Sequence, residues 1–151
     1  MNNNLRWICE NDDVETITIS KVEAIFGVKF PTDYIDIVMK NDGGYPMPDR
    51  FNLNDNEEVF NNLLSFDEED SNNILDTYYD VKDRLFEEII PFAEDPFGNL
   101  ICFDYRQSSQ PTVVFWEHET ASKDKNAAIK KISDTFTELL DSLYEHKEEK
   151  C

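Results

Sequence analysis

The fold of this chain is decided by two neighbouring stretches, Phe30-Pro31-Thr32-Asp33-Tyr34 and Asn41-Asp42-Gly43-Gly44-Tyr45-Pro46. Together they predict a short helix with a sharp start and a glycine stop. Pro31 has a fixed φ and no N–H, so it suits the approach to a helix, and the hydroxyl of Thr32 can cap the first free amides. Gly43 and Gly44 then allow a turn with positive φ, and Pro46 prevents the helix from continuing. On the residues alone, these features describe an ordinary capped helix.

Apolar spacing predicts the other elements on either side of this helix. We expect helices over residues 20–26, 71–84 and 132–144, and strands over residues 50–53, 58–66, 89–93, 100–105 and 112–117. Residues 1–14 are expected to form a loose arm or short helix whose Trp7 packs on the body, and residues 146–151 a frayed tail. Pro91 should lie at a sheet edge or strand start, because it cannot donate to a ladder. This order predicts one α+β domain over residues 1–151.

The charge of the chain is strongly negative and unevenly distributed. The net charge is −19, and residues 51–100 hold fourteen acidic and two basic residues, a net charge of −12. Such a field repels nucleic acid and anionic membranes and attracts basic proteins. Acidic residues also promote solubility. The charge therefore predicts either a surface for a basic protein or a solvated face, and it argues against nucleic-acid and membrane partners.

Residues that carry enzyme chemistry are sparse. The two histidines are His118, expected at a strand end between two glutamates, and His146 in the tail, which gives no nucleophile–base pair. The oxygen-rich run at residues 67–73 lacks the glycine of a calcium loop. We therefore expect no enzyme activity, metal or cofactor. The start of the chain has no hydrophobic signal region and no stretch reaches 18 apolar residues, so we expect a cytoplasmic protein.

The order and spacing of these motifs resemble the SUKH superfamily, a group of bacterial immunity proteins with eukaryotic cell-wall-regulator relatives. The matching positions are Gly27, Phe30, Pro31, Tyr34, Asn41, Gly43, Gly44 and Pro46, together with segments 90–95, 98–104, 113–119 and 132–136. The resemblance covers about residues 17–143 and implies an antiparallel sheet flanked by helices. Phe30 replaces the usual leucine, and Asp42 is inserted before the glycines. We assign Pro31, Tyr34, Gly43, Gly44 and Trp116 to the fold rather than to contact with a partner.

The resemblance also implies a function, which is protection against a polymorphic toxin, often a nuclease. A nuclease must be basic where it holds phosphates, so an acidic protein can cover that surface and block it without chemistry. The predicted partner is the basic C-terminal domain of a cognate toxin. The predicted contact residues lie in the acidic middle of the chain and are Glu57, Glu58, Asp67, Glu68, Glu69, Asp70, Tyr79 and Asp80. The alternative function is a regulatory or scaffolding module that binds a cellular protein.

Overall fold

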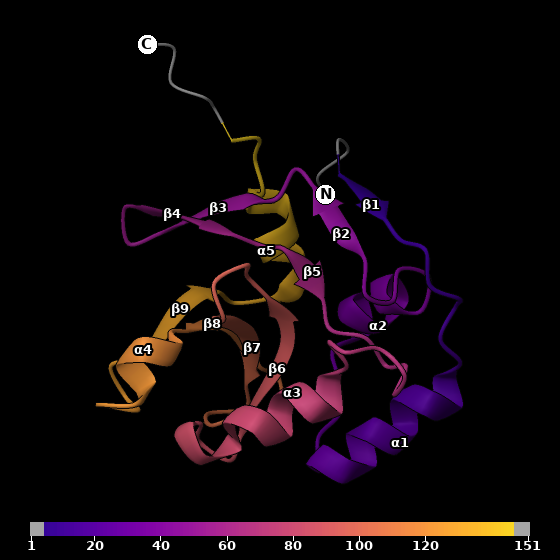
Figure 1. The fold of residues 1–151 in the computed structure, drawn as a ribbon, viewed down its shortest axis with the longest axis horizontal. Coiled ribbons are helices and arrows are strands. Elements are labelled where there is room, and N and C mark those ends of the chain that lie inside the picture. The colour runs from indigo at the N-terminus through magenta and orange to yellow at the C-terminus, as the bar shows by residue number, and fades with distance from the viewer. Residues whose placement is uncertain (1–4, 147–151) are drawn as a thin grey trace.

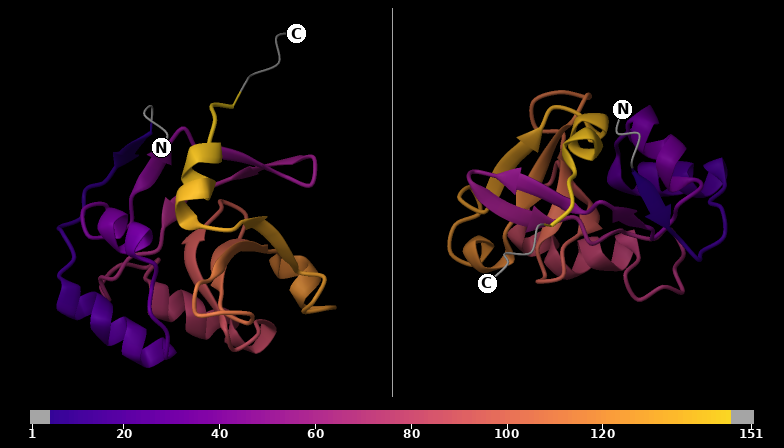
Figure 2. Two further views of the ribbon diagram at one scale, coloured as in Figure 1. Left: turned by 180° about the vertical axis from the view of Figure 1, so that it is seen from behind. Right: turned by 90° about the horizontal axis from the view of Figure 1, so that it is seen from above.

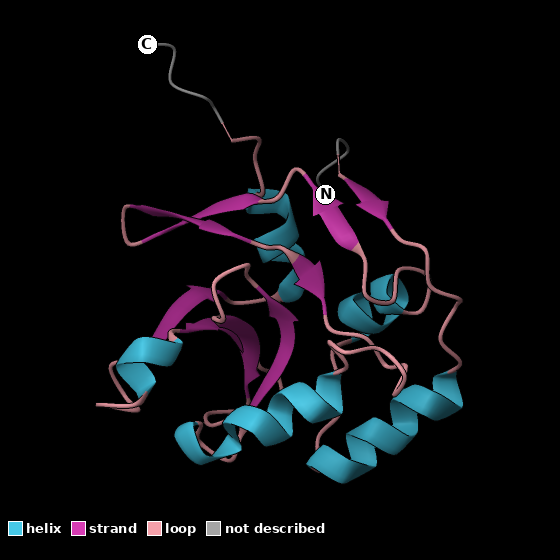
Figure 3. Cartoon of the chain, viewed as in Figure 1, coloured by secondary structure: helices cyan, strands magenta, loops and turns pink. Residues whose placement is uncertain are grey.

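An antiparallel sheet of five strands forms the centre of the computed structural model, which describes residues 5–146 (Figures 1 and 3). Its strands are β5 (Asn62–Leu63), β6 (Ile89–Glu94), β7 (Leu100–Asp104), β8 (Thr112–Trp116) and β9 (Ile129–Ser133), in that order across the sheet. The strands β6, β7 and β8 are almost continuously apolar because both faces of the sheet are covered. The α+β class expected from the sequence is confirmed.

Within the described residues, five α-helices and two smaller ribbons surround this sheet. The helices are α1 (Thr16–Phe26), α2 (Thr32–Val38), α3 (Ile74–Val81, continued by the 3₁₀ turn Lys82–Arg84), α4 (His118–Ala121) and α5 (Phe136–Ser142). The ribbons are β1 (Arg6–Ile8) with β2 (Tyr45–Met47), and the hairpin of β3 (Arg50–Leu53) with β4 (Asn56–Val59). Figure 1 shows α1 and α3 along the lower side, and Figure 2 shows the two ribbons on opposite sides of the molecule.

The core between the sheet and α2 is mainly aromatic. Tyr34 of α2 is fully buried, and its ring makes edge contacts with Phe92, Phe103 and Phe136 at centroid distances of 5.1 to 5.5 Å. Phe92 and Phe103, on neighbouring strands, stack at 4.1 Å. Such aromatic pairs add to the free energy of burial. On the other face of the sheet, Trp116 lies in a second apolar cluster. The short helix α2 is therefore fixed by its packing against the sheet.

The helix and glycine stop predicted around residues 30–46 are present, with one difference at the start. Gly43 has a φ of +69°, and a Cβ on Gly44 would lie 2.8 Å from a backbone oxygen, so both positions require glycine. Thr32 is the first helical residue and Pro31 is the N-cap, so the predicted cap is wrong. Asp33 instead joins α2 to α5, because its Oδ2 accepts hydrogen bonds from the amide and hydroxyl of Thr137.

The closing helix begins later than the sequence pattern indicated. The expected helix over residues 132–144 is α5 alone, and Ile129–Ser133 forms the edge strand β9. The spacing of Ile132 and Phe136 matches a helix, but pairing with β8 satisfies backbone groups along the edge of that strand. The Oγ1 of Thr135 accepts a hydrogen bond from the amide of Glu138 at 3.1 Å, so Thr135 caps the start of α5.

Four further boundaries differ from expectation. Arg6–Ile8 is a strand rather than a loose arm or helix, although Trp7 does pack on the body, 6.0 Å from Phe60. The helix α1 starts at Thr16, before residue 20. The segment 58–66 divides into β4 and β5, and α3 starts at Ile74, after a loop over residues 66–73. The predicted tail lies outside the described residues beyond His146.

Pro91 lies inside β6, next to a register shift between Pro91 and Ala93, rather than at an edge or a strand start. A bulge tolerates a residue without an N–H, because the ladder is already interrupted there.

Candidate functional site

The predicted contact residues lie at three separate places. Glu57 and Glu58 belong to β4, the run Asp67–Asp70 to the loop before α3, and Tyr79 with Asp80 to α3 itself. Figure 1 shows the β3–β4 hairpin and the loop before α3 on opposite sides of the molecule. The acidic middle of the sequence therefore supplies several surfaces rather than one.

Glu57 on the hairpin is engaged within the protein. Its carboxylate accepts a hydrogen bond from the Tyr144 hydroxyl at 3.1 Å, lies 2.5 Å from Nδ1 of His146 and 3.8 Å from Nη1 of Arg50. The hydrogen bond with His146 is the main cause that lowers the pKa of Glu57. This residue ties the hairpin to the segment after α5, so its charge is partly compensated.

An acidic groove of about 460 Å³ lies between α3 and the turn that joins β6 to β7. Asp80, Glu94 and Asp95 line it, and Glu58 is close enough for Asp95 to raise its pKa, after the larger effect of burial. Partial burial, and then Asp95, raise the pKa of Glu94. Sequence reasoning missed Glu94 and Asp95 as residues that line a groove, because their run indicated only a hairpin turn. Only the tertiary fold brings them beside α3.

The acidic loop, residues 67–70, is attached to the inserted residue Asp42. The carboxylate of Asp42 is 2% exposed and accepts hydrogen bonds from the Ser65 hydroxyl at 2.6 Å and the Phe66 amide at 2.7 Å. Burial raises its pKa, although these hydrogen bonds oppose the shift. The side-chain amide of Asn11 donates to Oδ2 of both Asp42 and Asp70. The base of the loop is therefore fixed, while residues 67–69 remain exposed.

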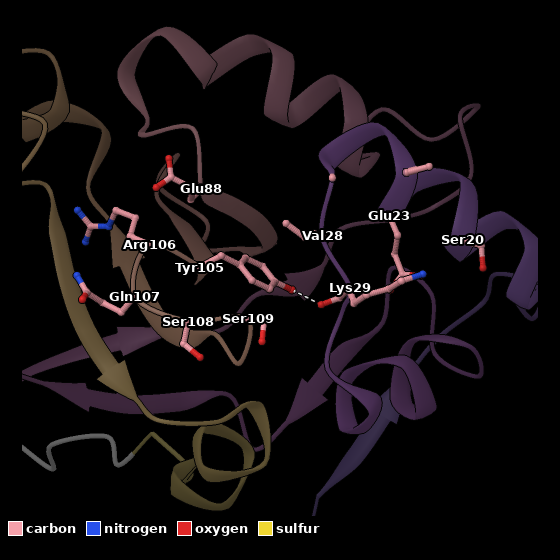
Figure 4. Close-up of a pocket in the computed structure, with 12 residues that line it drawn as sticks. Ser20, Glu23, Val28, Lys29, Glu88, Tyr105, Arg106, Gln107, Ser108 and Ser109 are labelled. Atoms are coloured by element: carbon pink, nitrogen blue, oxygen red, sulfur yellow. Dashed lines mark hydrogen bonds between the residues drawn. The ribbon is translucent and has the colours of Figure 1, made fainter.

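A further cavity, of about 740 Å³, lies between α1 and the segment after β7 (Figure 4). The hydroxyl of Tyr105 donates to the backbone oxygen of Lys29 at 2.8 Å, which joins the two walls. The carboxylate of Glu23, which also lines the cavity, accepts a hydrogen bond from the Phe30 amide at 2.6 Å. Serines 20, 108 and 109 line the cavity. No sequence pattern predicted this cavity, because segments that are distant in the chain form it.

Two side chains with catalytic potential, His118 and Cys102, have different surroundings. His118 is the first residue of α4, and its ring lies over Gly98, where a Cβ would be 3.3 Å away. Cys102 is fully buried, and burial raises the pKa of its thiol. Within residues 5–146, no group of three or more His, Cys, Asp or Glu side chains could hold a metal ion. No helix in this range is long and apolar enough to cross a membrane.

Comparison with known proteins identifies the family. The chain is 36% identical over 69 residues to the SPbeta prophage-derived uncharacterized protein YokK of Bacillus subtilis (strain 168). This match covers 46% of the chain and 32% of that protein, so the chain spans about a third of the relative's length. The model of the SMI1/KNR4 family (SUKH-1) matches residues 14–142, which include the α2 motif, the whole sheet and α5. With this match over most of its length, the chain belongs to the SMI1/KNR4 family (SUKH-1).

Proposed function

We propose that this protein is an immunity protein that binds a cognate protein toxin and neutralises it by covering its active surface. Family membership indicates an immunity-protein type of role. The observation that carries the choice of partner is the net charge of −12 over residues 51–100. Surfaces that together carry this charge attract a basic protein and accelerate association with it.

A nuclease domain is the toxin that fits this charge best. Its substrate is a polyanion, so its active surface must present basic side chains to phosphates. A bound acidic protein satisfies those side chains and excludes the substrate by charge and by volume. This mechanism needs no reaction on the toxin, so the proposed function is non-enzymatic.

The acidic loop, residues 67–70, is the part of the predicted contact set with the most available charge. Asp67, Glu68 and Glu69 are exposed, and the base of their loop is fixed by the Asp42 carboxylate. A fixed, charged loop loses little conformational entropy on binding. Glu57, in contrast, is engaged with His146 and Tyr144. We infer that the loop contributes more to association than the β3–β4 hairpin.

The first test is to purify the tagged protein from its own cells at low salt and to identify what is bound. We expect a basic toxin domain at one-to-one stoichiometry, which dissociates at high salt and whose activity the added protein inhibits. A partner that belongs to a housekeeping complex and has no toxic activity would overturn the immunity role. It would favour a scaffolding module instead.

The second test reverses the charge of the acidic loop. The variant Asp67→Lys, Glu68→Lys, Glu69→Lys, Asp70→Lys should bind the purified toxin domain at least about tenfold more weakly, with a smaller salt dependence. A matched control reverses the same number of exposed carboxylates on other elements, at Asp36, Glu87, Glu119 and Glu145. Equal losses in both variants would show that only the total charge matters, and unchanged affinity in the first would remove the loop from the interface.

A further inference from the structure

Three large apolar side chains are exposed on one face of the β1–β2 ribbon. Ile8 is 53% exposed, Tyr45 48% and Met47 53%. In the register of the ribbon, Ile8 is opposite Tyr45, and Met47 is opposite Arg6. Directly opposed residues in an antiparallel pair, and residues two apart along a strand, point to the same face. The three apolar side chains therefore form one continuous patch.

The ribbon holds this patch in place because its other face is anchored in the core. Trp7, between Arg6 and Ile8 on β1, packs edge-on against the buried ring of Phe60, and Pro46 on β2 is buried. The amide of Leu63 donates to the backbone oxygen of Gly44 at 2.9 Å, which joins the ribbon to β5. The patch therefore cannot turn inward without breaking these contacts.

The patch is unusual among the described residues. The other large apolar side chains exposed to a similar degree are Ile17 and Ile25 on α1, Tyr79 on α3 and Phe97 in the β6–β7 turn. These four side chains are distributed over three separate segments. The three exposed apolar side chains of the ribbon, in contrast, lie on two paired strands. Single exposed apolar residues are normal on a protein surface, but a rigid cluster marks a contact site.

Mainly acidic side chains border the patch, and the basic Arg6 lies on the same face, opposite Met47. Glu10, Asp12 and Asp13 follow β1 directly, and Lys40 pairs with Asp13 at 2.9 Å. The bond from Asn11 to Asp70, at 2.9 Å, places the acidic loop beside the same segment, as Figure 1 also shows. An apolar centre with a charged border is the usual anatomy of a protein–protein interface.

We propose that the β1–β2 ribbon face is the central contact for a basic protein partner, and that the acidic loop contacts basic side chains around it. This inference rests on the proposed function and names the face that performs it. Charge complementarity favours this occupant over a second copy of the chain, because two chains of net charge −19 repel each other. Three half-exposed side chains also supply far less than the roughly 800 Å² per partner of a standard interface, so the surrounding charges must contribute.

Photo-crosslinking tests this placement in the cells that make the protein. Benzoylphenylalanine is placed at Tyr45 in one variant and, as matched controls, at Phe97 beside the acidic groove and at Tyr79 on α3. We expect an adduct with a protein of net positive charge at position 45 but not at position 97 or 79. Adducts at position 97 without one at position 45 would overturn the inference and favour the acidic groove.

The protein captured at position 45, once purified, is then the probe in affinity measurements. The double variant Ile8→Ser, Met47→Ser should weaken binding about 30-fold at every salt concentration, with an unchanged salt slope. Ile25→Ser, with an equally exposed isoleucine on α1, is the control and should bind like the unmodified protein. The loop reversal at residues 67–70 should change the salt slope instead. Equal affinity of the double variant and the unmodified protein would overturn the inference.

These outcomes separate the inference from the proposed function. A toxin domain captured at position 45 and inhibited by the protein supports both. A basic protein without toxic activity, captured there with the expected loss in the double variant, supports the ribbon face and overturns the immunity role. A toxin domain captured only at position 97 or 79 supports the immunity role and overturns the ribbon face.

Discussion

Asp42 determines how the acidic loop is held. It stands between Asn41 and the glycines, one residue more than the related motif contains. A buried carboxylate is costly unless hydrogen bonds stabilise it, and here Ser65 and Phe66 supply them from the start of the loop. The additional residue in the turn after α2 therefore fixes a loop that is remote in the sequence. The sequence showed the insertion, but its role depends on partners more than twenty residues away.

Tyr34 offers a test of what a motif residue contributes. Among residues 5–146, its hydroxyl is the buried side-chain polar atom without a hydrogen-bond partner. Tyr34→Phe removes the cost of burying that hydroxyl, so the free energy of unfolding should stay equal or rise by about 1 kcal/mol. Tyr34→Ala should lower it by about 3–5 kcal/mol, because the ring fills the core.

Urea unfolding of both Tyr34 variants at neutral pH gives these values. A loss of more than about 1 kcal/mol in Tyr34→Phe would show that the hydroxyl is hydrogen-bonded, for example to a buried water molecule. The motif tyrosine would then be required for its hydroxyl as well as for its ring.

Thr135 caps the start of α5. The Oγ1 of Thr135 accepts from the Glu138 amide, and the Glu138 carboxylate accepts from the amide of Asp134 at 3.3 Å. Thr135→Ala removes the cap and should lower the free energy of unfolding by about 1 kcal/mol. Thr135→Ser keeps the hydroxyl and should recover most of that loss. Chemical denaturation of the two variants measures the difference, and equal losses would show that the threonine methyl group matters rather than the cap.

An element could be predicted from the sequence when the residues that determine it are close together in the chain. The apolar strands β6, β7 and β8 and the glycine stop at residues 43–44 follow from short patterns, and the sequence predicts them well. The strand β9 could not be predicted in this way, because the position of Ile132 fits a helix as well as a strand. Pairing with the edge of β8 decides between the two. Similarly, β6 can contain Pro91 because its register with β7 shifts beside that residue.

The candidate surfaces also combine features that the sequence predicts with features that only the fold creates. Composition predicts the negative charge of residues 51–100, but the charge spreads over the hairpin, the acidic loop and α3 because turns separate these segments. Glu94 and Asp95 join Asp80 only through the fold. The apolar ribbon patch was not predicted, because residues 6–8 and 45–47 are far apart in the sequence and are brought together by strand pairing.

At the scale of the whole molecule, the net charge of −19 should make stability depend on salt. Like charges repel most in the compact state. Raising NaCl from 20 to 300 mM shortens the Debye length from about 20 to about 6 Å and screens this repulsion. We expect the free energy of unfolding to rise by about 1 kcal/mol over this range, measured by urea denaturation at each salt concentration.

The loop variant used for binding also tests this account of stability. Reversing the four carboxylates at residues 67–70 changes the net charge to −11, so the response to salt should be smaller than in the unmodified protein. The matched reversal at Asp36, Glu87, Glu119 and Glu145 has the same net charge and should respond equally, since screening acts on the total field. A fall in stability with salt would mean that ion pairs such as Lys40–Asp13 outweigh the repulsion. A difference between the two variants would show that the loop concentrates the field, which is the property that a basic partner would use.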